Sequence, residues 1–140
     1  MKRESFVFFG MVVFVFITLL SCNQKEALTW NEEFLIKVDS IHYPDQLNVG
    51  QTLDIQFFGM VGHNGCSNFK RFIVSKNDSV YTIQVVGERK MGKNLICTEA
   101  IQFLNDKKIS LLQDTAGVFK IEIINPGLNQ GIRAEVEVVP

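Results

Sequence analysis

Apolar and polar residues alternate with a period of two along most of the chain after residue 34. The clearest stretch is 52–57, where Leu53, Ile55 and Phe57 alternate with polar residues. Successive side chains of a β-strand point to opposite faces of a sheet, so this alternation predicts a strand with one buried face. The same reasoning predicts strands at residues 36–39, 69–76, 81–86, 100–104, 108–112, 119–123 and 132–138.

Polar segments rich in Asn, Asp and Gly separate these runs. Residues 76–79 predict the turn of one hairpin, and residues 125–131 predict the loop of a last hairpin. The alternation is blurred within 69–76, which indicates a β-bulge. After residue 22 no run of ten or more residues has a convincing helical period. About seven short strands in one domain are typical of a β-sandwich, and a small β-barrel is the alternative fold.

One local segment resembles the immunoglobulin-like class of sandwiches. Residues 114–119 are similar to the Asp-x-Ala/Gly-x-Tyr sequence that starts the penultimate strand of such domains, with Phe119 in the place of the tyrosine. The resemblance implies an antiparallel sandwich of about seven strands. A phenylalanine cannot form that tyrosine's hydrogen bond. The positions of Cys66, Cys97 and Trp30 also differ from those of antibody domains, so we expect a disulfide that joins loops and not the centres of two sheets.

The N-terminal residues have the pattern of a secretory signal. Residues 6–20 are apolar except for Gly10 and Thr18, and Lys2 and Arg3 precede them. A membrane-spanning helix needs about 20 apolar residues, so this run is short for a span. An uncleaved single-pass anchor, the alternative, would need a longer run and no processing site.

The end of the apolar run resembles the lipobox of bacterial lipoproteins, in the sequence Leu19-Leu20-Ser21-Cys22. The departure is Leu20, where Ala, Ser or Thr is commoner. The resemblance implies cleavage after Ser21 and a diacylglyceryl group on the Cys22 thiol. Two or three acyl chains on one residue give stable anchoring. We therefore expect a signal peptide at 1–21, a lipidated cysteine and tether at 22–33, and a β domain at 34–140.

The resemblance places the protein in the bacterial cell envelope, attached to a membrane through lipid on Cys22. In lipoproteins, an Asp directly after the lipidated cysteine resembles a signal for retention in the inner membrane. This chain has Asn23 at that position, so we expect the outer membrane. Residues 24–26 match only part of a signal for surface export. The periplasmic face and the cell surface therefore both remain open.

The cysteine count agrees with an oxidising compartment. The chain has three cysteines, and setting Cys22 aside leaves Cys66 and Cys97, which we predict to form a disulfide. A metal site built from this pair with His63 and His42 is the rival interpretation. The sequence has no Cys-x-x-Cys or paired-histidine spacing, so we predict no metal and no cofactor.

Two segments are candidates for binding. The loop 59–66 contains three glycines that could bring its backbone close to an anion, although it lacks the spacing of a phosphate-binding loop. A turn fixed by Cys66 is the simpler interpretation. The run 88–93 is the most basic stretch of the chain. From these segments we select a candidate binding loop, which consists of His63, Asn64, Arg89, Lys90 and Lys93.

The carboxylates, the histidine and the net charge limit the classes of function that the sequence supports. The carboxylates are scattered along the chain. His63 is near Cys66 and Ser67 in sequence, but sequence neighbours rarely have the geometry that nucleophilic catalysis needs, so we expect no catalytic site. A formal net charge of −1 and an envelope location argue against nucleic acid as a partner. We predict a binding module with an envelope protein or glycan partner. A structural or assembly component of the envelope is the alternative, and an enzyme of unrecognised type is the least favoured class.

Overall fold

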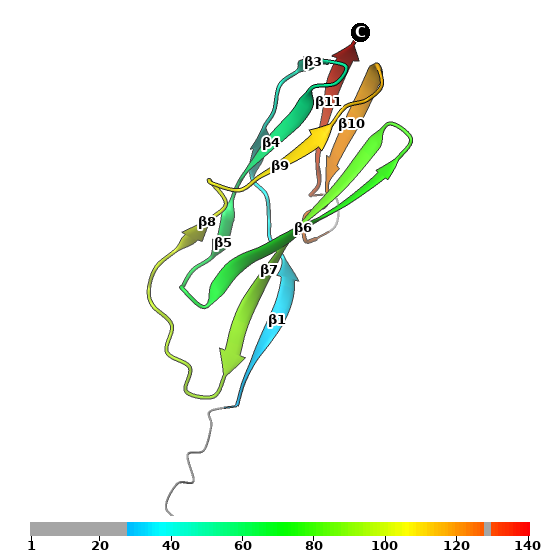
Figure 1. The fold of residues 1–140 in the computed structure, drawn as a ribbon. Coiled ribbons are helices and arrows are strands. Elements are labelled where there is room, and N and C mark those ends of the chain that lie inside the picture. Colours follow the sequence, from blue (N-terminus) through cyan, green and yellow to red (C-terminus); the bar gives the residue numbers. More distant parts are fainter. Residues whose placement is uncertain (1–27, 128–129) are drawn as a thin grey trace, which may run out of the picture.

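The computed structural model describes residues 28–127 and 130–140, and these residues form strands and no helix (Figure 1). The all-β prediction is therefore confirmed. The strands are β1 (Thr29–Leu35), β2 (Ser40–His42), β3 (Gln46–Asn48), β4 (Thr52–Phe58), β5 (Met60–Gly62), β6 (Ser67–Asn77), β7 (Val80–Gly92), β8 (Gln102–Phe103), β9 (Lys108–Leu112), β10 (Gly117–Ile123) and β11 (Ile132–Val139).

Part of the expected organisation lies outside this description. The signal peptide, Cys22 and residues 23–27 of the tether are not among the described residues. Within the described ranges there is no helix of the length and hydropathy that crossing a membrane requires.

The largest sheet is organised around β7, which is 13 residues long. One edge of β7 pairs with β6. Its other edge is shared by two strands, because β1 pairs with residues 86–92 and β10 pairs with residues 80–83. The sheet then continues through β11 to β3. The β7–β10 and β11–β3 pairs are parallel, so this sheet is mixed, whereas the sequence had led us to expect antiparallel pairing.

A smaller set of strands covers one side of the large sheet (Figure 1). Strands β2, β4 and β9 form an antiparallel sheet, and β5 and β8 form a two-stranded ribbon. Gly59 separates β4 from β5, at a point where the chain passes close to its own backbone. A Cβ at Gly59 would lie 2.5 Å from the carbonyl oxygen of Lys37. The close approach explains a glycine at this position.

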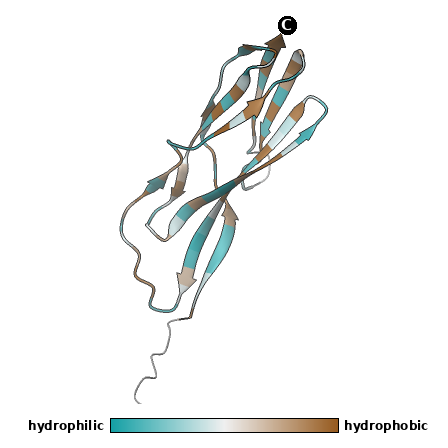
Figure 2. Ribbon diagram, viewed as in Figure 1, coloured by the Kyte–Doolittle hydropathy of each residue, from teal (hydrophilic) through white to brown (hydrophobic). Residues whose placement is uncertain are grey.

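The core lies between the two layers. The inward side chains of β4, which are Leu53, Ile55 and Phe57, are fully buried, as the alternation predicts, and they pack in one cluster with residues of β7, β10 and β11. Phe57 meets Phe72 of β6 with ring centroids 4.8 Å apart. The alternating colours along the strands in Figure 2 show the same two-faced pattern. Burial of this apolar surface is the main favourable term in folding.

The predicted elements agree with the structure where the signals are local. The hairpins β6–β7 and β10–β11 are present, and the bulge in β6 falls between Phe69 and Arg71. The strand expected at 100–104 is reduced to β8.

The first predicted strand, 36–39, is wrong. These residues cross from one sheet to the other: Ile36 N donates to Val85 O at 2.8 Å, and Asp39 N donates to Phe58 O at 2.8 Å. Ile36 and Val38 are buried, so the alternation reported burial and not strand pairing. The first strand is instead β1, and its residues 29–33, which we had assigned to the tether, pair with β7.

Candidate functional site

The disulfide between Cys66 and Cys97 is present, with the two Cα atoms 5.3 Å apart. It joins the β5–β6 turn to the segment between β7 and β8, so it links loops, as predicted. Two backbone hydrogen bonds reinforce the link. Gly65 N donates to Thr98 O, and Lys90 N donates to Cys66 O, each at 2.9 Å. The turn, the segment after β7 and the end of β7 are thereby held together.

Two of the five residues of the candidate binding loop form contacts within the domain, and the other three are exposed. Asn64 stabilises the turn, because its side-chain Oδ1 accepts from Cys66 N at 3.1 Å. Arg89 is engaged within the domain, since its guanidinium lies 3.3 Å from a Glu32 carboxylate oxygen and 5.5 Å from the Phe34 ring centroid. His63, Lys90 and Lys93 are exposed. A binding role for these three residues remains a prediction.

A metal site or a catalytic thiol at these cysteines would require a free sulfur. Both cysteine sulfurs are joined to each other, so neither is a thiolate that could bind a metal or attack a substrate. Ser67 is buried at 6% exposure. Across residues 28–127 and 130–140, no three His, Cys, Asp or Glu side chains lie close enough to hold a metal ion.

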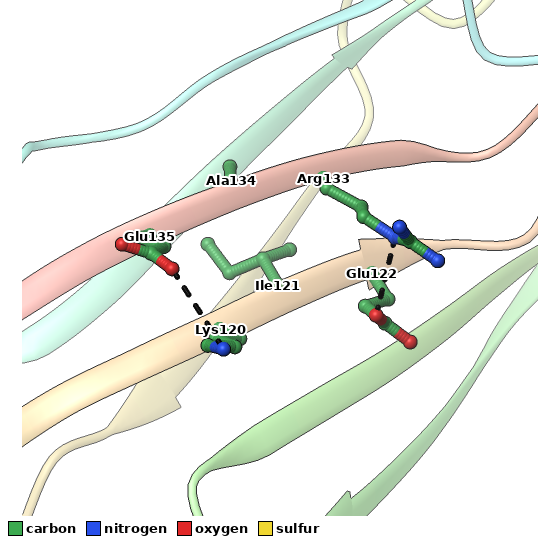
Figure 3. Close-up of a pocket in the computed structure, with 6 residues that line it drawn as sticks. All are labelled: Lys120, Ile121, Glu122, Arg133, Ala134 and Glu135. Carbon is green, nitrogen blue, oxygen red and sulfur yellow. Dashed lines mark ion pairs between the residues drawn. The ribbon is translucent and has the colours of Figure 1, made fainter.

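A shallow depression of about 420 Å³ lies on the outer face of β10 and β11 (Figure 3). Two cross-strand ion pairs border it. Lys120 Nζ lies 4.0 Å from Glu135, and Arg133 Nε lies 3.4 Å from Glu122. These residues are directly opposite each other in the register, so the charges cancel in pairs. Each of the two carboxylates at the depression, Glu122 and Glu135, is thus engaged by a cation of the neighbouring strand.

A denser ionic cluster ties β1 to β6 across β7. The Arg71 guanidinium binds both carboxylate oxygens of Glu33, at 2.9 and 2.8 Å, and Lys70 Nζ lies 2.9 Å from Glu33 and 3.0 Å from Glu88. Hydrogen bonds from Arg71 and then Lys70 lower the pKa of Glu33 from 4.5 to about 2. Sequence reasoning missed this cluster because its acidic residues are distant in sequence from Lys70 and Arg71 and meet them only through strand register. It holds the strand that leads to the tether.

The ribbon of β5 and β8 exposes apolar side chains. Met60 and Phe103 are opposite each other in register, so their side chains share a face, and they are 37% and 53% exposed. Ile101, two residues before Phe103, is 51% exposed. We call Met60, Ile101 and Phe103 the ribbon face. Clustered exposed apolar side chains mark interaction surfaces more often than single ones do. Sequence alternation could not identify this face, because β8 is only two residues long.

Comparison with protein families, with curated proteins and with solved structures finds no match to this chain.

Proposed function

We propose that the chain is a lipid-anchored protein of the bacterial cell envelope whose β domain is an interaction module. The lipobox residues Leu19–Cys22 support the anchor. The disulfide supports an oxidising compartment, in which such bonds persist. The ribbon face carries the assignment of an interaction module, since its apolar side chains are exposed to solvent. An envelope protein is the partner whose chemistry fits an apolar face.

We also propose that the fold is a variant of the immunoglobulin-like sandwich. In that class the second and fifth strands pair in one sheet and the last two strands pair in the other. The pairing of β4 with β9 and of β10 with β11 supports this relation. The structure departs from this class at β10, because its neighbour β7 runs parallel to it. β7 is the second strand of the β6–β7 hairpin.

Photocrosslinking in intact cells tests the interaction module. We would place a photoreactive amino acid at Phe103, and at Lys120 on the charged face as the control. We expect a discrete adduct from position 103 only, which the double substitution Met60→Ser and Ile101→Ser removes. Adducts of equal yield from both positions, or none from position 103, would contradict the proposal and favour a structural role.

The anchor is tested separately. Cys22→Ser should release the protein from membranes and abolish incorporation of radiolabelled acyl chains, because the thiol that carries the lipid is gone. A variant that stays in the membrane without lipid would show that residues 6–20 are an uncleaved anchor.

A further inference from the structure

β1 begins at one end of the domain, beside the end of β7 (Figure 1). Three apolar residues in and near these strand ends are exposed. Leu28, Trp30 and Ile96 are 81%, 54% and 94% exposed. Trp30 is opposite Met91 near the end of β7, and Ile96 follows in the next segment. A single exposed apolar side chain needs no explanation, but three at one end of a small domain indicate contact with something outside it.

Ile96 is held in place although it is almost fully exposed. The next residue, Cys97, is joined to Cys66, and Thr98 O accepts the hydrogen bond from Gly65 N. Asn94, on the other side, has a left-handed φ of +63° that turns the chain after β7. The side chain of Ile96 therefore projects from a fixed backbone, and it contributes little to the core.

The charges at this end favour a negatively charged surface. Lys90 and Lys93 are exposed, and neither forms an ion pair with another described residue. Arg89 is neutralised by Glu32, and Glu99 is the acidic residue of the segment after β7. A small positive excess thus remains at this end. Lys90 is paired with Asn31, so its side chain extends from the face of the β1–β7 pair opposite to that of Trp30, and the two share a surface only at the tip of the domain. Tryptophan and lysine together are typical of the headgroup layer of a membrane, where rings meet the acyl boundary and ammonium groups meet phosphates.

The length of the tether brings this end to the bilayer. Five residues lie between Cys22 and Leu28, and a fully extended chain covers at most about 3.6 Å per residue, so the six steps from Cys22 to Leu28 span at most about 20 Å. We propose that Leu28, Trp30, Ile96, Lys90 and Lys93 form a tether-end surface that docks on anionic lipid headgroups. This inference rests on the proposed acylation of Cys22. It places the domain upright on the membrane, with the C-terminal end directed away from the bilayer.

Fluorescence of the acylated full chain tests the docking. Trp30 is the only tryptophan, so its emission reports on this surface without a label. We would reconstitute the protein in vesicles of phosphatidylethanolamine and phosphatidylglycerol, with and without brominated acyl chains. We expect Trp30 emission to move to shorter wavelength and to be quenched by the bromines. Lys90→Glu with Lys93→Glu should reduce the quenching.

The matched control moves the probe to the far end of the domain. Val118 is 52% exposed on β10, where Gly117 pairs with Val138 near the C-terminus. In Trp30→Phe with Val118→Trp we expect no quenching. Equal quenching of both probes, or no quenching of Trp30 in protein that floats with the vesicles, would overturn docking and leave the anchor intact. A short-wavelength shift without quenching would also overturn it, because Trp30 would then be buried against protein. Protein that carries no acyl chain would instead refute the anchor.

Discussion

The side-chain amide of Asn125 pairs with both backbone polar groups of Val38, 87 residues away in sequence. Val38 N donates to Asn125 Oδ1, and Asn125 Nδ2 donates to Val38 O, each at 2.8 Å. Val38 lies in the segment that crosses between the sheets, and it is not part of a strand pair. The amide thus replaces the missing strand neighbour, and both residues are buried. A buried backbone group without a hydrogen-bond partner destabilises the folded state, so this contact stabilises the crossing segment.

Replacing Asn125 with Ala should lower the free energy of unfolding by about 2–4 kcal/mol, because two buried backbone groups of Val38 lose their partners. Urea denaturation monitored by circular dichroism measures this loss. Asn105→Ala, at an exposed turn position, is the matched control and should change stability by less than about 0.5 kcal/mol. Equal effects of the two substitutions would show that the amide pairing does not support the crossing.

Removing the disulfide should destabilise the domain without changing its fold. Cys66 and Cys97 are 31 residues apart, and closing such a loop in the unfolded chain is worth about 3–4 kcal/mol in conformational entropy. The double variant Cys66→Ser and Cys97→Ser should show this loss in chemical denaturation, and dithiothreitol should have no further effect on it. Two reactive thiols in the unreduced wild-type domain would contradict the disulfide itself.

The Glu33 cluster predicts an acid-sensitive contribution to stability. The pKa of Glu33 is lowered from 4.5 to about 2, so its stabilisation is complete above 4.5 and is lost as the pH falls through about 2. The Glu33 side chain is 44% exposed, and solvent screening keeps the effect small.

Thermal unfolding as a function of pH measures this contribution. Glu33→Gln should lower the melting temperature at neutral pH, and the difference from the wild type should vanish at the acidic end. Glu99→Gln, an exposed substitution outside the cluster, should leave the melting temperature unchanged. A pH-independent difference for Glu33→Gln would assign the effect to packing and not to ionisation.

Gly59→Ala should destabilise the domain more than Gly117→Ala. The two glycines have similar φ angles of +158° and +146°, but only at Gly59 would the added Cβ meet backbone, 2.5 Å from Lys37 O. No atom lies within 4 Å of the corresponding position at Gly117. Overpacking of this kind costs about 1–3 kcal/mol, and urea denaturation of both variants would resolve it. Similar losses at both sites would show that the φ angle dominates.

Sequence alone was sufficient for features that depend on neighbouring residues. The alternation at 52–57 and 132–138 identified β4 and β11, because successive residues of a strand lie on opposite faces of the sheet. The turn residues at 76–79 identified the β6–β7 hairpin for the same reason. The cysteine count was enough to pair Cys66 with Cys97, since only one pair remained once Cys22 was set aside.

The tertiary structure decided whatever depends on which segments meet. Nothing in the local pattern of 36–39 distinguishes a strand from a buried crossing, because both bury alternate side chains, and only the partners of Ile36 and Asp39 separate the two. The shared edge of β7, the cluster around Glu33 and the exposure of Trp30 and Phe103 have the same origin. A sequence shows which face of a strand is apolar. What covers that face is set by contacts between distant segments. Where the domain leaves apolar side chains uncovered, as on the ribbon face and the tether-end surface, only the structure could suggest the two proposals made above.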